Sequence, residues 1–180
     1  FRRFFFIFRF LVFFIPFSLF GQQIKHLGVY DGIRSGAVRA FEKDSLGYMW
    51  IGTSQGLNRY SGYQFKNYDK FLSSGVVDII SENGNLFVLG AKGELLQYSY
   101  EQDTFKQILA LKNVKFLSFK ILNSTTIIIG LQKGLLVYDL ESKSLSKILH
   151  YNAMFNRRIH LKENKIYVAT TKGIIVYDYV

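Results

Sequence analysis

The sequence MWIGTSQGLNRY at residues 49–60 returns three times along the chain in altered form. The other copies are LFVLGAKGELLQY (86–98), IIIGLQKGLLVY (127–138) and IYVATTKGIIVY (166–177). Each copy has a small residue and, eight positions later, a tyrosine; the pairs are Gly52 and Tyr60, Gly90 and Tyr98, Gly130 and Tyr138, and Ala169 and Tyr177. The tyrosines are 38, 40 and 39 residues apart. This regular spacing indicates a structural repeat of about 39 residues.

Each repeat is predicted to form short β-strands. Apolar runs rich in Val, Ile, Tyr and Phe, separated by Gly, Asn and Asp, are typical of strands joined by tight turns. The predicted strands are 38–42, 48–53, 56–60 and 64–68, then 76–81, 85–89, 94–99 and 104–109, then 114–121, 126–130, 134–139 and 144–149, and finally 157–161, 165–169 and 173–178. The fourth repeat lacks an outer strand. The sequence therefore predicts an all-β fold of β-propeller blades, with four antiparallel strands in a blade, as part of a larger propeller.

The composition narrows the function classes. The 180 residues contain 23 Lys plus Arg against 13 Asp plus Glu, for a net charge of +10, and no cysteine. The absence of cysteine excludes a disulfide scaffold, thiolate metal ligands and a cysteine nucleophile. The basic residues are spread over the loops instead of forming a run, so we expect no nucleic-acid partner.

The first 21 residues have the layout of a secretory signal peptide. Three arginines, Arg2, Arg3 and Arg9, precede an apolar run from Phe10 to Phe20, and the small residue Gly21 follows. The run of 11 residues is shorter than the roughly 20 that a membrane-spanning helix needs, so a retained anchor is the weaker alternative. We therefore expect a signal peptide at 1–21 and a partial propeller of about four blades at 22–180, in the periplasm or secreted.

Residues 24–68 resemble the two-component regulator propeller repeat of bacterial hybrid two-component sensors. The residues that carry the resemblance are Asp44, Gly47, Trp50 to Thr53, Gly56, Leu57, Arg59, Tyr60 and Gly62. The later repeats keep the Gly and Tyr skeleton alone. The resemblance implies a periplasmic ligand-sensing module that responds to polysaccharide-derived oligosaccharides and is truncated before its kinase part. It also implies further blades, downstream signalling domains and an inner-membrane anchor, and it allows a homodimer, in the full-length form.

Two kinds of alternative stay open. The four repeats could close into a small four-bladed ring, in which residues 24–30 would pair with the fourth repeat as its missing outer strand. The function could instead be that of a secreted propeller enzyme, a glycan lyase or hydrolase, or of a protein-interaction scaffold.

Few residues carry a chemical signal of their own. The chain has no catalytic motif, so we expect no enzymatic activity from these residues and no cofactor. The histidines His26, His150 and His160 have no partner at metal-ligand spacing, so no metal site is predicted. Trp50 could stack on a sugar, but its place in a repeated apolar segment favours packing between blades.

Three lysines form the one candidate binding pattern. Lys92, Lys133 and Lys172 each precede the second glycine of their repeat, so they occupy equivalent turns on one face of the propeller. Their fields should add and attract an anion, which favours an acidic oligosaccharide as the ligand. The alternative is that they are ordinary polar hairpin residues.

Overall fold

The fold is all-β, as predicted. A computed structural model describes residues 24–180 except 69, 71, 73–74, 150–154 and 180, so the predicted signal peptide lies outside the described residues. A short 3₁₀-helix, Val29–Asp31, precedes the strands. No described helix is long and apolar enough to cross a membrane.

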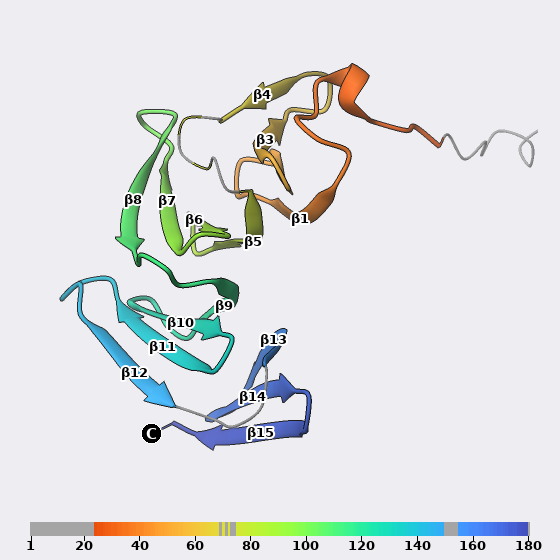
Figure 1. Cartoon of the computed structure of the whole chain (residues 1–180). Helices are drawn as coiled ribbons and strands as arrows, with labels where there is room; N and C mark the ends of the chain where they lie inside the picture. Colours follow the sequence, from red (N-terminus) through yellow and green to blue (C-terminus); the bar gives the residue numbers. More distant parts are fainter. Residues whose placement is uncertain (1–23, 69, 71, 73–74, 150–154, 180) are drawn as a thin grey trace, which may run out of the picture.

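The strands form four antiparallel sheets in sequence order (Figure 1). Blade 1 contains β1 (Val38–Lys43), β2 (Met49–Thr53), β3 (Gly56–Tyr60) and β4 (Phe65–Asn67). Blade 2 contains β5 (Val76–Glu82), β6 (Asn85–Gly90), β7 (Glu94–Ser99) and β8 (Thr104–Ala110). Blade 3 contains β9 (Phe116–Ile121), β10 (Thr126–Leu131), β11 (Gly134–Asp139) and β12 (Leu145–Leu149). Blade 4 contains β13 (Phe155–Lys162), β14 (Lys165–Thr170) and β15 (Gly173–Asp178).

The core lies between the blades, because successive side chains of a strand point to opposite faces of its sheet. In β6, Leu86 and Val88 join the cluster between blades 1 and 2, whereas Phe87 and Leu89 join the cluster between blades 2 and 3. All four are buried. A central blade needs apolar residues on both faces, which explains why its inner segments read as continuous apolar runs.

The inner strands of neighbouring blades lie side by side along the concave side of an arc (Figure 1). These strands are β1, β5, β9 and β13, the first strand of each blade. Each carries a β-bulge or irregularity near its start. The order of the blades along the chain is therefore also their order around the arc.

The closed four-bladed alternative is not what the structure shows. Among the described strands β15 pairs with β14 alone, and residues 24–31 lie beside blade 1, away from blade 4 (Figure 1). The backbone N–H of Arg34 donates to Asn58 Oδ1 at 2.9 Å, which holds this segment on blade 1. Both end faces of the arc consequently expose apolar side chains, with Phe41 and Ile174 each 72% exposed.

The small residue at the end of β2 is required by the packing of blades 1 and 2. A Cβ atom built on Gly52 would lie 2.4 Å from Cγ1 of Val76 and 2.7 Å from its Cβ. Gly90 is also confined, since a Cβ there would lie 2.5 Å from Glu94 Oε2 and 2.7 Å from Leu72 Cδ2, in the segment that joins blades 1 and 2. Gly52 thus permits the close approach of blades 1 and 2.

Candidate functional site

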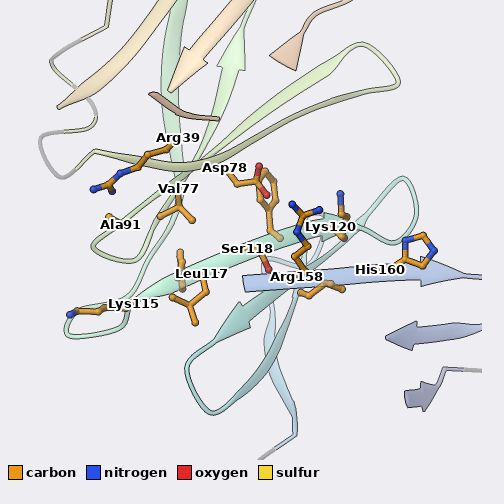
Figure 2. A pocket seen from close by; sticks show the side chains of 13 residues that line it. Arg39, Val77, Asp78, Ala91, Lys115, Leu117, Ser118, Lys120, Arg158 and His160 are labelled. Carbon is orange, nitrogen blue, oxygen red and sulfur yellow. The ribbon is translucent and has the colours of Figure 1, made fainter. Parts of the chain in front are cut away.

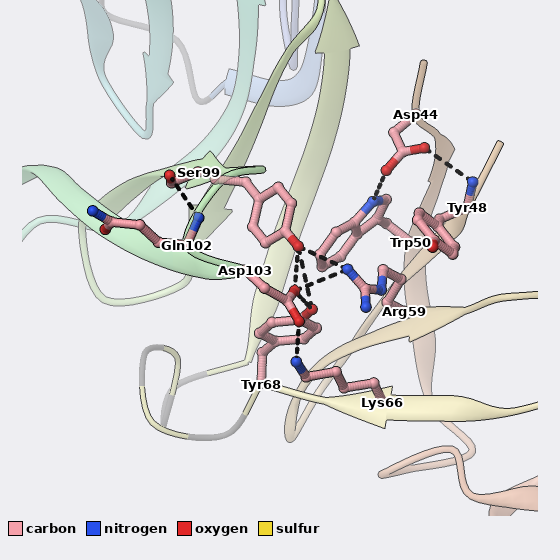
Figure 3. Close-up of polar contacts among 10 residues, drawn as sticks. Asp44, Tyr48, Trp50, Arg59, Lys66, Tyr68, Ser99, Gln102 and Asp103 are labelled. Carbon is pink, nitrogen blue, oxygen red and sulfur yellow. Dashed lines mark hydrogen bonds and ion pairs between the residues drawn. The ribbon is translucent and has the colours of Figure 1, made fainter. Parts of the chain in front are cut away.

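Trp50 lies at the interface between blades 1 and 2 and is fully buried, as the packing prediction required. Its ring contacts those of Tyr68, Tyr98 and Phe105, with centroids 4.8–5.5 Å away. The indole N–H donates to Asp44 Oδ2 at 2.7 Å, and Asp44 Oδ1 accepts from the backbone N–H of Tyr48 (Figure 3). Asp44 Oδ1 also accepts from the backbone N–H of Leu46. A side chain sealed in this way cannot stack on a sugar.

A polar cluster centred on Asp103 lies beside this tryptophan (Figure 3). Asp103 Oδ1 lies 2.9 Å from Arg59 Nη1 and accepts from Tyr68 at 2.5 Å and from Tyr98, while Oδ2 pairs with Lys66. Arg59 comes from blade 1 and Asp103 from blade 2, so the ion pair joins the two blades. We call this set the interblade clamp: Arg59, Lys66, Tyr68, Tyr98 and Asp103.

The clamp shifts the acidity of its members. Burial raises the pKa of Asp103, but hydrogen bonds from Lys66, Tyr68 and Tyr98 and the charge of Arg59 outweigh burial and hold the pKa well below its usual value. Burial, followed by the hydrogen bond to Asp103, raises the pKa of Tyr98 to about 12. Each charge in the clamp has an opposite charge beside it, which is the arrangement of a structural network.

A second polar region is an open groove instead of a cluster of paired charges. A groove of about 970 Å³ runs along the inner strands of all four blades. It is lined by Arg39 on β1, by Val77 and Asp78 on β5, by residues 115–120 at and along β9, by residues 158–160 on β13, and by Ala91 at the β6–β7 turn (Figure 2). This is the central groove of the arc, the usual position of a propeller ligand channel.

The central groove is positively charged. Its lining contains four cationic side chains and one carboxylate: Arg39, Lys115, Lys120 and Arg158, with Asp78. The four cations are exposed, and none of them has an ion pair with another described residue. Exposed like charges around a concave surface add their fields and attract anions.

Asp78 is the acidic member of the groove lining. Burial raises its pKa, against the opposing effects of the backbone N–H of Ile79 and the charges of Lys120 and Arg158. The N–H of Ile79 donates to Asp78 Oδ1 at 3.0 Å, which orients the carboxylate. Lys120 and Arg158 lie toward Asp78 in the groove (Figure 2), so this part of it carries both an acceptor and donors.

The three predicted lysines occupy equivalent turns, and all three are exposed. Each turn follows the second strand of its blade, whose end pairs with the start of the inner strand, as Val76 pairs with Gly90 and Phe116 with Leu131. Lys92, Lys133 and Lys172 therefore lie at the end of the arc where the inner strands begin. Ala91, the neighbour of Lys92, lines the groove, and none of the three lysines does.

The sequence analysis missed the groove and the centre of the clamp. Asp78, Ser118 and Arg158 are spaced by 40 residues each, close to the repeat length, and this spacing is the signal that could have found them. Asp103 lies 44 residues from Arg59 in a turn with no motif. No group of acidic, histidine or cysteine side chains with metal-binding geometry occurs in the part of the chain that the structure describes.

An arc of antiparallel blades around a shared groove is a β-propeller segment, and solved structures agree. The chain matches the extracellular domain of the hybrid two component system BT3049 from B. thetaiotaomicron with a TM-score of 0.67 and 17% identity, over 87% of this chain and 26% of that domain. The extracellular domain of BT4673 from the same organism matches at 0.67 and 26% identity, over 87% and 22%. The computationally designed Ika4 protein matches at 0.67 and 14% identity, over 88% and 98%.

Two sequence comparisons find similarity to two-component sensors. Residues 32–55 match the family model described as "Two component regulator propeller". A 59-residue stretch is 36% identical to Histidine kinase P4 of Formosa agariphila, over 31% of this chain and 4% of that protein. The family match covers β1, β2 and the turn before β3, within the stretch that carries the sequence resemblance. The chain spans a small part of this relative and about a quarter of the BT3049 domain.

Proposed function

We propose that this chain is a ligand-sensing propeller segment of a periplasmic two-component sensor, and that its ligands are oligosaccharides derived from polysaccharides. The observation that carries the proposal is the central groove, because residues from the inner strands of all four blades line a single cavity. The family match of blade 1 and the likeness to extracellular sensor domains support it. In this proposal these residues bind a ligand and carry out no catalysis.

The groove suits a signalling role because a ligand bound in it would contact several blades together. Such a ligand would stabilise one arrangement of the inner strands over others, and differential affinity for two arrangements is what a ligand needs to transmit a signal. We propose that a longer protein passes this change to its remaining blades and its downstream signalling domains. In this proposal the longer protein is anchored in the inner membrane and is able to form a dimer.

The turn lysines have a secondary place in this function. Lys92, Lys133 and Lys172 lie in turns at the end of the arc where the inner strands begin, and in this proposal their field draws an acidic ligand toward the groove. Exposed cations each contribute only about 0.2–1 kcal/mol, so their effect is modest and falls with salt. We expect the replacement of all three by Gln to weaken binding of an acidic glycan a few-fold and to reduce its salt dependence.

The proposal is tested by measuring oligosaccharide binding to the purified chain. A panel of neutral and acidic oligosaccharides from plant and algal polysaccharides is titrated against the protein by calorimetry. Saturable binding of at least one member, with the ligand recovered intact, supports a sensor. Cleavage of a member would support the lyase or hydrolase alternative, and the absence of binding across the panel would contradict the proposal.

A further inference from the structure

One position of the central groove recurs in blades 2, 3 and 4. It is the residue before the apolar side chain that the inner strand packs toward the preceding blade: Asp78 before Ile79, Ser118 before Phe119, and Arg158 before Ile159. Ile79, Phe119 and Ile159 belong to the three successive interblade clusters, which confirms that their positions are equivalent. Asp78, Ser118 and Arg158 consequently lie at one level of the groove.

Ser118 provides the observation that points to a ligand. The residue is 6% exposed, and its buried hydroxyl has no hydrogen-bond partner among the residues that the structure describes. Its cross-strand neighbour is Gly130, which has no side chain to meet it. Buried hydroxyls are nearly always hydrogen-bonded, so one that lines an open groove and lacks a partner is suited to receive one from a ligand.

The charges around Ser118 define what that ligand is. Lys120 lies on the same strand, and Arg158 lies on the adjacent inner strand; both are exposed, and Figure 2 shows their side chains near Ser118. A carboxylate placed there would accept from Ser118 Oγ and from both cations. Charge-assisted hydrogen bonds of this kind are the strong ones, and arginine can make two at once.

Asp78 adds an acceptor to the site. It lies on β5, across β9 from Arg158 on β13. Its carboxylate accepts the N–H of Ile79, and carboxylate oxygens have further lone pairs that can accept from a hydroxyl. A ligand with a carboxylate and neighbouring hydroxyl groups, which a uronic acid has, would satisfy both halves of the site. A neutral sugar would bring no negative charge to Lys120 and Arg158, whose charged neighbours are Asp78 and, for Lys120, also Glu42.

We propose that Asp78, Ser118, Lys120 and Arg158 form a uronate-binding subsite in the central groove. The carboxylate of one sugar unit is held by Ser118, Lys120 and Arg158, and a hydroxyl of the same unit donates to Asp78. This proposal rests on the proposed sensing function and names the ligand class of its groove. It also places the principal contacts within the groove and not at the turn lysines.

The test is calorimetric titration with trigalacturonate, trimannuronate and a hyaluronan tetrasaccharide as probes, and with galactotriose as the neutral comparison. We expect at least one carboxylated probe to bind more tightly than galactotriose. We expect Lys120→Gln/Arg158→Gln to weaken that binding tenfold or more, and Ser118→Ala to weaken it several-fold.

Two further variants separate the subsite from overall charge. Lys106→Gln/Lys143→Gln removes the same charge from exposed residues outside the groove lining and should leave affinity within about twofold. The triple Gln variant of Lys92, Lys133 and Lys172 should lose less affinity for the carboxylated probe than the groove double variant. Equal losses in the groove and control double variants would overturn the subsite.

The outcomes also separate this proposal from the proposed function. Binding of galactotriose alone, or binding of a uronate that the groove variants leave unchanged, would overturn the uronate subsite while the sensing function stands. A chain that binds none of these probes and no member of the wider panel would overturn both.

Discussion

The interblade clamp and the central groove both contain charged side chains, but the charges of the clamp are paired within the fold and most of those of the groove are not. In the clamp, Asp103 pairs with Arg59 and Lys66 and accepts from two tyrosines. In the groove, Lys115, Lys120 and Arg158 are exposed and have no ion pair with another described residue. A charge that is satisfied within the fold stabilises it, whereas a charge left open to a cavity is available to a ligand. Substitutions in the clamp should therefore change stability, and substitutions in the groove should change binding.

The largest expected effect is on stability, from Trp50→Ala. The indole is fully buried among three aromatic rings and donates to Asp44, so its removal leaves a cavity and an unsatisfied carboxylate oxygen. We expect the free energy of unfolding to fall by about 3–5 kcal/mol, measured by urea denaturation. Ile174→Ala, at an exposed position of β15, should change it by less than about 0.5 kcal/mol. Similar losses in the two variants would contradict the role of the Trp50 cluster.

A smaller loss of stability is expected from Asp103→Asn. The amide keeps the shape of the carboxylate but removes the charge opposite Arg59, whose side chain is only 17% exposed. We expect a loss of about 1–3 kcal/mol. Glu101→Gln changes an exposed acid in the same turn and serves as the control, with an expected change within about 0.5 kcal/mol. If the two variants unfold alike, Asp103 does not hold the blades together.

The clamp should also weaken at alkaline pH. The pKa of Tyr98 is raised to about 12 from its usual value of 10, because its burial and its bond to Asp103 favour the neutral phenol. Its contribution to stability is full below pH 10 and is lost as the pH rises through about 12. The difference in unfolding free energy between the wild type and Tyr98→Phe should therefore shrink over this window. A titration followed by tyrosinate absorbance that gives Tyr98 a pKa near 10 would contradict this expectation.

The sequence predicted the backbone well because the repeat constrains it. The Gly and Tyr skeleton predicts the strands of blades 1 to 4 within about two residues of where they lie, because the apolar runs between its positions fill the interblade clusters. Trp50 was assigned to interblade packing for the same reason.

The polar regions were harder to predict because their residues come from different blades. Arg59 and Asp103 are 44 residues apart and meet only when blades 1 and 2 pack. Asp78, Ser118 and Arg158 differ in chemistry, so a search for repeated residue types passes over them, although their spacing of 40 residues matches the repeat. Lys92, Lys133 and Lys172 were found in the sequence because they are identical, yet none of them lines the groove.

The smallest expected effect on stability is from the groove. Lys120 and Arg158 are exposed, so Lys120→Gln/Arg158→Gln should leave the free energy of unfolding within about 0.5 kcal/mol of the wild type. Urea denaturation alongside Asp103→Asn gives the direct contrast. A groove variant that unfolds as readily as the clamp variant would show that the two regions do not differ in role.

The most direct test of the account is hydrogen–deuterium exchange with and without a saturating carboxylated oligosaccharide. We expect slower exchange along the inner strands, at residues 76–82, 115–121 and 158–162, and little change in the clamp or in the turns that carry Lys92, Lys133 and Lys172. Protection confined to those turns, or to the clamp, would contradict the claim that the central groove is the binding site.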